Sequence, residues 1–213
     1  MSHAAVSLPR PVLLRRGLLL EYLTVGWNIV EGIVAIAAGS VAGSPSLIGF
    51  GVDSFVESVS GAALIWRLRA ELSGNQEDEA AVERNERRAE RFVGIAFLLL
   101  GAYVAFEAVT TLINQEAPAA SPIGIVLMVV SIGVMLWLAR AKRQTGEALH
   151  SRALIADARQ TQACWYLSVT ALIGLGANAA FGLWWADPVA ALVIVVFLVR
   201  EGIEAIRGED EDE

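Results

Sequence analysis

Residues 46–66 read SLIGFGVDSFVESVSGAALIW, and this stretch decides the fold of the chain. It is apolar enough to lie in a bilayer, yet it contains two carboxylates, Asp53 and Glu57. On a helix, residues four apart project from one face, about 6 Å apart along the axis. Ionised carboxylates at bilayer depth are energetically expensive and usually face a cavity or a partner. We therefore expect both acids to be functional; the alternative is that they only hydrogen bond to neighbouring helices.

The composition of the whole chain is that of a membrane protein. Of its 213 residues, 55% are hydrophobic and 18% are charged, and the net charge is −7. A soluble domain of this length would carry more charge and fewer uninterrupted apolar runs. No basic patch of the kind that nucleic acid needs is visible, so no nucleic-acid partner is expected. Cys164 is the single cysteine, which excludes an intrachain disulfide.

Six helices of membrane-spanning length can be placed along the chain, at about 20 residues each. The expected spans are 17–39, 45–66, 92–114, 122–140, 153–180 and 184–206. The sequence predicts an all-α membrane protein with a tail at 1–16, a six-helix transport domain at 17–206 and an acidic tail at 207–213. The first apolar run contains polar residues that a signal peptide lacks, so we do not expect it to be cleaved.

The positive charges predict the orientation of these spans. Fifteen of the 16 Lys and Arg residues lie in or beside the N-terminus, the segments 67–91 and 140–152, and the end of the last span. None lies in the three short turns. By the positive-inside rule, both termini and the two charged segments are cytoplasmic, in a protein of the bacterial inner membrane. Glu21 is then expected near the inner interface, where its side chain reaches water.

Two segments of the chain match one another without a gap. Residues 153–164 read ALIADARQTQAC and align with residues 46–57, SLIGFGVDSFVE. Gln160 falls on Asp53 and Cys164 falls on Glu57, so each segment carries two potential ligands four residues apart. The two helices run in opposite directions, and an inverted three-helix repeat of this kind places a substrate site near the midplane. A chance match of a short segment is the alternative.

These four side chains make a mixed hard and soft ligand set. Thiolate with carboxylate suits zinc and neighbouring divalent transition metals better than magnesium or calcium. Cys164 would bind as the thiolate, with Asp53, Glu57 and the amide oxygen of Gln160 beside it. The alternatives are that Cys164 is a small buried apolar residue and that Gln160 forms an interhelical hydrogen bond.

Three further polar residues are candidates for the metal path. Asn28 and Glu31 share one helix face, and Glu31 is expected at the depth of Asp53, as a further ligand or part of the exit path; the alternative is a polar pair in helix packing. Asp157 lies seven residues from Cys164, about 10.5 Å along a helix, so both cannot bind one ion. We expect Asp157 to be a partner of Arg159 or another polar group, or a relay on the cytoplasmic side.

Together these residues resemble the transmembrane domain of the cation diffusion facilitator (cation efflux) family, over roughly 17–206. The matching segments are Asp53-x-x-x-Glu57, Gln160-x-x-x-Cys164, Ala156-Asp157-Ala158 and Trp185-Ala186-Asp187-Pro188. The resemblance implies a homodimeric exporter, usually of zinc, that works by alternating access with proton antiport. The metal is then the transported substrate, and no tightly bound cofactor is expected.

The chain also departs from the family pattern. The family usually has His and Asp where Gln160 and Cys164 stand, and His often couples metal to protons, so Glu57 or Asp157 would carry the proton here. The family's cytoplasmic metal-binding domain is not expected after the last span, and the chain resembles the divergent, truncated branch with the six-helix domain only.

The function that the sequence favours is transport of a divalent metal cation, zinc or a similar transition metal. An intramembrane zinc peptidase would need a His-Glu-x-x-His motif, which the chain lacks, and no enzyme is expected. A membrane metal sensor or a scaffold subunit without transport is the alternative.

Overall fold

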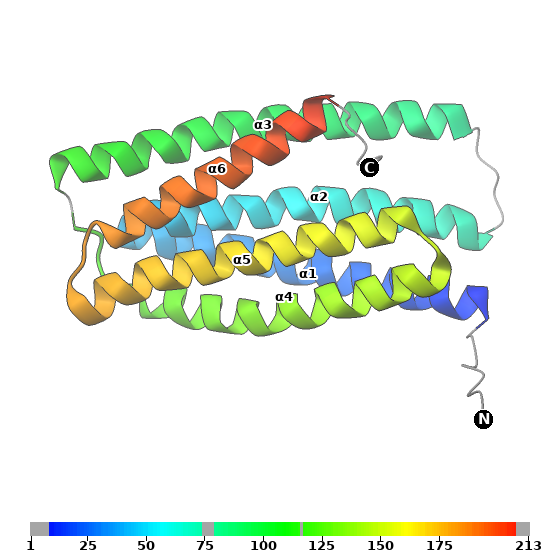
Figure 1. The fold of residues 1–213 in the computed structure, drawn as a ribbon, viewed down its shortest axis with the longest axis horizontal. Coiled ribbons are helices and arrows are strands. Elements are labelled where there is room, and N and C mark those ends of the chain that lie inside the picture. Colours follow the sequence, from blue (N-terminus) through cyan, green and yellow to red (C-terminus); the bar gives the residue numbers. More distant parts are fainter. Residues whose placement is uncertain (1–8, 74–78, 116, 208–213) are drawn as a thin grey trace.

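The computed structural model contains six helices and describes residues 9–73, 79–115 and 117–207. Within these ranges, every regular element is a helix. The helices are α1 (Arg10–Ala42), α2 (Pro45–Ser73), α3 (Glu79–Asn114), α4 (Pro122–Leu149), α5 (Arg152–Phe181) and α6 (Ala186–Arg207). Figure 1 shows them running lengthwise side by side, and the expected all-α class is confirmed.

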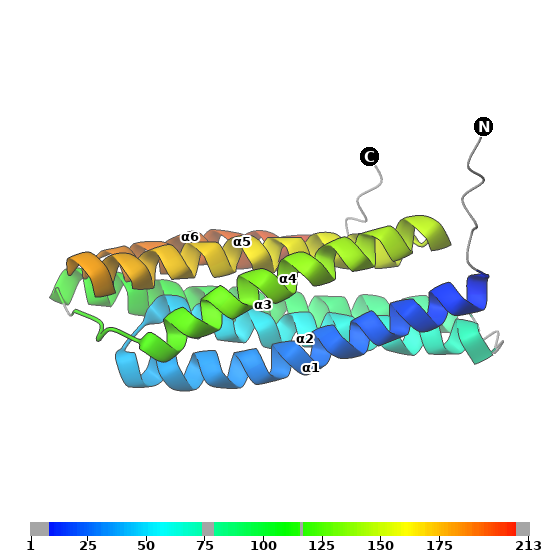
Figure 2. The same ribbon diagram turned by 90° about the horizontal axis from the view of Figure 1, so that it is seen from below.

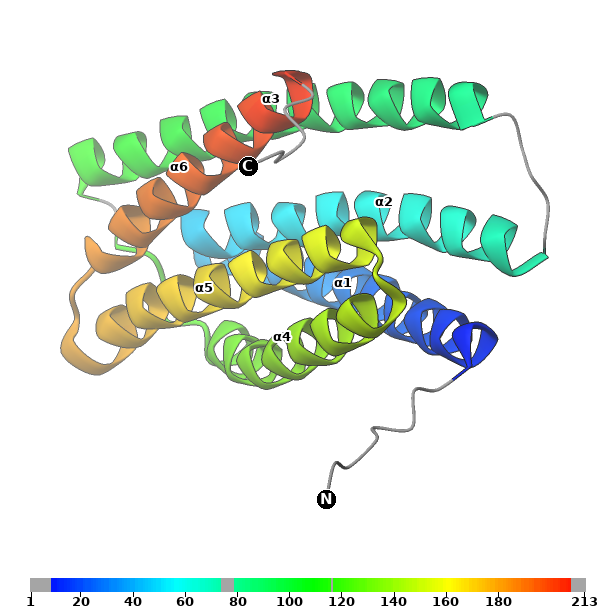
Figure 3. The same cartoon turned by 45° about the vertical axis from the view of Figure 1, so that its right-hand side comes forward.

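Successive helices run in opposite directions along the bundle. The start of α1, the end of α2 and the α4–α5 turn lie at one end, which we call the N-terminal end (Figure 1). The α1–α2 and α5–α6 connections lie at the other, which we call the Pro45 end. Three pairs pack most extensively: α1 with α2, α3 with α6, and α4 with α5. Figures 2 and 3 show the resulting bundle, in which α5 lies against α4 and passes beside α2.

Several helices extend further than the sequence predicted. Helix α1 begins at Arg10 rather than at 17, and α2 continues to Ser73. The segment 140–152, expected as a loop, is helical through Leu149. The reason is amphipathicity, since buried residues continue along one face of α4 at Lys142, Thr145, Gly146 and Leu149. Of the charged segment 67–91, residues 67–73 and 79–91 are also helical.

Local signals in the sequence set the helix ends. Pro45 and Pro122 each stand at the first position of a helix, where proline costs no hydrogen bond. The hydroxyl of Ser121 accepts a hydrogen bond from the Gly124 N–H at 3.1 Å and caps α4. Asp187 lies in the first turn of α6, as expected for a helix start. Its carboxylate is fully buried and accepts hydrogen bonds from the hydroxyls at positions 44 and 46.

The outside of the bundle is apolar and much of its interior is polar. Exposed large hydrophobic side chains lie on α1, α3, α4, α5 and α6, among them Leu19, Ile33, Leu99, Phe106 and Val126. Buried acids, hydroxyls and one lysine lie within. Such a surface suits lipid rather than water. Five helices are long and apolar enough to cross a membrane, namely α1, α2, α4, α5 and the Phe97–Asn114 part of α3. That α6 also crosses, as the sixth span, stays a prediction.

Glycines let α1 and α2 approach closely. A Cβ atom added at Gly32 would lie 2.8 Å from the carbonyl oxygen of Gly51 and 2.9 Å from the ring of Phe55. Backbone oxygen cannot be displaced cheaply, so the pair packs in this way only with glycine at position 32. Small residues allow such close contacts between membrane helices. The position of α2, and of its two acids, therefore depends on this contact.

Replacing this glycine should weaken the bundle. We expect Gly32→Ala to lower the free energy of unfolding by ~1–3 kcal/mol, the usual cost of overpacking. Thermal unfolding of the purified protein in detergent measures the change. Gly26→Ala is the matched control on the same helix, because a Cβ there meets nothing within 4 Å. Equal loss in both variants would show that the close contact does not matter.

Candidate functional site

The two acids of α2 both face α5. The Cys164 thiol donates a hydrogen bond to Asp53 Oδ2, with Sγ and Oδ2 3.1 Å apart. One turn nearer the N-terminal end, the Thr161 hydroxyl donates to Glu57 Oε1 at 2.8 Å. All four side chains are buried. The expectation that α2 and α5 present these polar groups to each other is confirmed, while their role as metal ligands stays a prediction.

Gln160 lies beside the Asp53–Cys164 pair. Its side chain is half-buried, and it lines a small cavity of about 10 Å³ together with Asp53 and Cys164. Apolar side chains complete the wall: Phe97, Ala163, Leu167 and Phe197. A space of this size holds no hydrated ion. A cation that bound between these groups would therefore have to lose its water.

The polar residues of α1 lie close to the same acids. Glu31 is fully buried and accepts a hydrogen bond from the Ser54 hydroxyl at 3.2 Å. Ser54 follows Asp53 in the chain, so Glu31 is near the expected depth. Asn28 is also fully buried, and neither polar atom of its side chain has a hydrogen-bond partner among the described residues. The shared face predicted for Asn28 and Glu31 thus points into the bundle.

A buried lysine completes the polar interior, and the sequence analysis missed it. The Lys142 ammonium is fully buried and donates hydrogen bonds to Asp157 Oδ2, to Glu21 Oε2 at 3.1 Å and to the Thr161 hydroxyl at 3.3 Å. Since Thr161 in turn donates to Glu57, a chain of polar contacts runs from α1 and α4 through α5 to α2. Polar neighbours in 140–152 favour a loop at Lys142, whereas the structure places this residue in α4.

The contacts of Lys142 decide two predictions, one about Glu21 and one about Asp157. Glu21 was expected to reach water at the interface, but this was wrong: its side chain is fully buried and forms an ion pair with Lys142. Asp157 was expected to pair with Arg159 or another polar group, and the polar group that it contacts is Lys142. The carboxylate of Asp157 is thus held by an ammonium, which argues against it as a metal ligand here.

Several buried acceptor atoms lack a hydrogen-bond partner within the described part of the chain. They include one oxygen each of Glu21, Glu31, Glu57 and Asp157. Buried polar atoms are almost always satisfied by protein, water or an ion, and leaving them unsatisfied is costly. Those of Glu31 and Glu57 belong to the carboxylates near the Asp53–Cys164 pair. A bound cation would compensate both the unsatisfied oxygens and the negative charge.

The ligand candidates are engaged with one another rather than grouped around one point. Among the described residues, no three His, Cys, Asp or Glu side chains are placed so that they could hold a metal ion together. The Cys164 thiol donates a hydrogen bond to Asp53, and the Thr161 hydroxyl donates one to Glu57. To bind one cation, these side chains would exchange their mutual hydrogen bonds for bonds to the metal.

Comparison with known proteins gives relatives that share this architecture. An uncharacterized transporter of Methanocaldococcus jannaschii is 26% identical over 181 residues, which are 84% of this chain and 63% of the relative. The magnetosome protein MamB of a Magnetospira species is 25% identical over 186 residues, which are 86% of this chain and 61% of the length of MamB. A cadmium, cobalt and zinc/H(+)-K(+) antiporter of Bacillus subtilis is 25% identical over 202 residues, which are 91% of this chain and 61% of the antiporter.

The chain spans about three fifths of the length of these relatives. A family model described as the cation efflux transmembrane domain matches residues 22–208. The match includes both acids of α2, the facing residues of α5 and the buried lysine of α4. The resemblance inferred from the spacing of the polar residues is thus confirmed, and the chain belongs to the cation efflux family.

Proposed function

We propose that this protein transports a divalent transition-metal cation, zinc or a chemically similar ion, across the membrane. Asp53, Glu57 and Cys164 bind the dehydrated ion, and Gln160 completes the site. The observation that carries the proposal is that both acids of α2 hydrogen bond to side chains of α5 in the buried interior of a bundle whose outside is apolar. Acids at this depth need a cationic partner.

The hydrogen bonds of the site support a simple exchange on metal binding. Cys164 donates a hydrogen bond to Asp53, and a metal that binds thiolate and carboxylate together would displace the thiol proton, which is released to water on the side from which the ion enters. Glu57 then turns from the Thr161 hydroxyl to the ion. Glu31 and Asn28 of α1 lie beside the site and would be further ligands or part of the path of the ion. Zinc suits this donor set because it accepts sulfur, carboxylate and amide oxygen.

Transport requires that the site open to each side in turn. The contacts of Lys142 with Glu21, Asp157 and Thr161 hold α1, α4 and α5 together on the N-terminal side of the site. In our proposal these contacts close that side, and they separate when it opens. The family resemblance adds a homodimer, proton antiport and cytoplasmic termini as further expectations. A membrane metal sensor would bind the ion without moving it.

Neutralising the acids of α2 should abolish transport. We expect Asp53→Asn and Glu57→Gln each to reduce zinc uptake into proteoliposomes by about tenfold or more, because even outer-shell changes reduce metal affinity 10- to 100-fold. An imposed pH gradient in the same vesicles tests proton coupling. Glu147→Gln is the matched control, since Glu147 is exposed and forms an ion pair with Arg143 across one helical turn.

The sensor alternative gives a different result in this experiment. A sensor would bind zinc to the wild-type protein, detected by equilibrium dialysis, without any uptake above protein-free liposomes. Unchanged uptake in Asp53→Asn would contradict the proposed site itself.

Replacing the thiol should change the preference among metals. In Cys164→Ser, zinc binding should weaken about tenfold while manganese binding changes little, because a hydroxyl is a harder ligand than a thiolate. Competition between the two ions in the uptake assay measures the ratio. Equal loss for both metals would mean that Cys164 only fills space in the core.

Removing the buried ammonium should open the N-terminal side. Cys164 is the only thiol, so its rate of reaction with a membrane-impermeant thiol reagent reports access from each side. Breaking a buried ion pair costs roughly 3–5 kcal/mol, so Lys142→Met should raise labelling from the N-terminal side about tenfold or more. Lys142→Arg keeps the charge and should label slowly, as the wild type does.

Two further variants serve as controls, one for the specificity of labelling and one for unfolding. Cys164→Ala must show no labelling. Lys142→Met with Asp157→Asn removes the charge pair together, which limits unfolding while still releasing α4 from α5. Labelling from the N-terminal side that stays at the wild-type rate in this folded double variant would refute the closing role of Lys142.

A further inference from the structure

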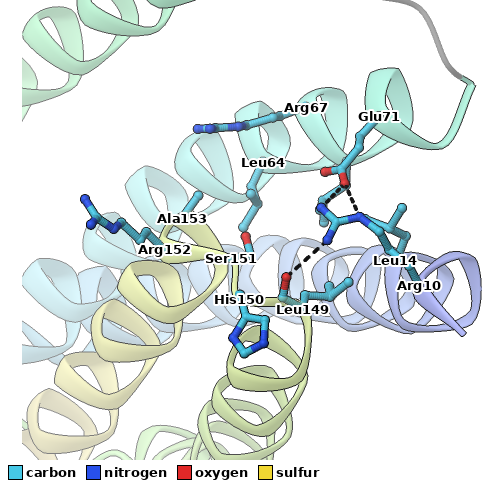
Figure 4. A pocket seen from close by; sticks show the side chains of 11 residues that line it. Arg10, Leu14, Leu64, Arg67, Glu71, Leu149, His150, Ser151, Arg152 and Ala153 are labelled. Atoms are coloured by element: carbon cyan, nitrogen blue, oxygen red, sulfur yellow. Dashed lines mark hydrogen bonds and ion pairs between the residues drawn. The ribbon is translucent and has the colours of Figure 1, made fainter. Parts of the chain in front are cut away.

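A second cavity lies at the N-terminal end of the bundle, well apart from the acids of α2. Its volume is about 340 Å³. The first turn of α1, the last turns of α2 and the α4–α5 turn surround it (Figure 4). Four of the lining residues are Arg10, Arg67, Glu71 and Arg152. From this rim, Lys142 lies seven residues inward of Leu149, about 10.5 Å along the helix.

The polar side of this cavity is basic. Three arginines from three different helices line it, against one carboxylate. Arg10 donates to Glu71 through Nε at 3.1 Å and Nη2 at 2.5 Å, and its Nη1 donates to the Leu149 carbonyl at 3.4 Å. In Figure 4 the Arg67 and Arg152 side chains extend away from the Arg10–Glu71 pair, toward the opposite side of the view. The one carboxylate among these lining residues is already paired with Arg10, so the cavity does not suit the divalent cation that we propose as substrate.

The other side of the cavity is apolar. Leucines at positions 14, 64, 68 and 149 form it, and each is at least nine-tenths buried. They belong to one hydrophobic cluster that joins α1, α2, α4 and α5. The cavity therefore offers guanidinium groups on one side and hydrocarbon on the other. A molecule that matches both has an anionic head and an apolar body.

Aromatic side chains place the cavity at the level of lipid headgroups. Trp66 directly precedes Arg67 and is 41% exposed. Tyr22 is 42% exposed, and the Arg69 guanidinium lies 5.3 Å from its ring centre. Trp and Tyr gather at the interface between hydrocarbon and water. An arginine-lined cavity beside them lies where phosphate groups of the bilayer are concentrated.

We propose that this cavity binds the phosphate of an anionic phospholipid, with the glycerol and upper acyl chain against the four leucines. Guanidinium groups bind phosphate oxygens with paired, charge-assisted hydrogen bonds. Because the cavity joins the ends of α1, α2, α4 and α5, a bound lipid ties together the helices that carry the buried lysine and its partners. This site is independent of the metal site proposed above.

Lipid titration of the full chain in detergent tests the proposal. Phosphatidylglycerol should bind about tenfold more tightly than phosphatidylcholine, as measured by native mass spectrometry. The double variant Arg67→Gln/Arg152→Gln should bind phosphatidylglycerol about tenfold more weakly than the wild type. The matched control Arg143→Gln/Arg200→Gln removes the same charge from exposed residues outside the cavity, which pair with Glu147 and Glu204, and should bind as the wild type does.

Three outcomes would overturn the proposal. Equal binding of the two lipids would show that the phosphate group is not recognised by charge. Equal weakening in the matched control would show that net charge, not the cavity, attracts the lipid. Competition by millimolar inorganic phosphate would mean that the cavity holds a soluble anion instead. If the double variant unfolds, Arg67→Gln alone and the comparison of the two lipids on the wild type still decide the question, without any metal flux.

Discussion

The ion pairs of Lys142 are the contacts on which the polar interior of this bundle depends. Within a bilayer, a charged side chain is tolerated only where it is paired, and removing one partner of a buried pair is strongly destabilising. The ammonium meets Glu21 from α1 and Asp157 from α5, and it reaches Glu57 of α2 through Thr161. One lysine on α4 therefore contacts side chains of α1 and α5 directly and is joined to α2 through Thr161.

The charge balance around this lysine explains what the rest of the site needs. Among the described residues, five acids are buried between the two ends of the bundle, and Lys142 is the buried base that faces them. The acids are Glu21, Glu31, Asp53, Glu57 and Asp157. Glu21 and Asp157 share the ammonium, so its charge does not balance that of the acids nearer the middle. In the function that we propose, a divalent ion would neutralise two of these acids at once.

The sequence predicted the helices and the facing of α2 and α5 because both depend on strong local signals. Apolar runs of 20 residues, prolines at helix starts and acids in an apolar segment can all be recognised without tertiary information. The sequence does not predict that Lys142 and Glu21 are buried together, because a polar composition is typical of a loop or an interface. The polar residues of 140–152 are typical of a loop. The spacing i, i+3, i+4, i+7 on one helix face, however, is followed by Lys142, Thr145, Gly146 and Leu149. The pairing of Cys164 with Asp53 rather than with Glu57 depends on the relative sliding of two helices, which no single sequence segment encodes.

The two ends of the bundle differ in charge, and this bears on how a cation would reach the centre. At the N-terminal end it meets Arg10, Arg67 and Arg152 and then the buried ammonium. At the Pro45 end it meets the buried carboxylate of Asp187, held by two serine hydroxyls. Charges that line an entrance change the rate at which ions enter. If both proposals hold, an anionic headgroup among the arginines would reduce the positive potential on that side, and lipid composition would then affect ion movement through electrostatics without any contact between lipid and metal.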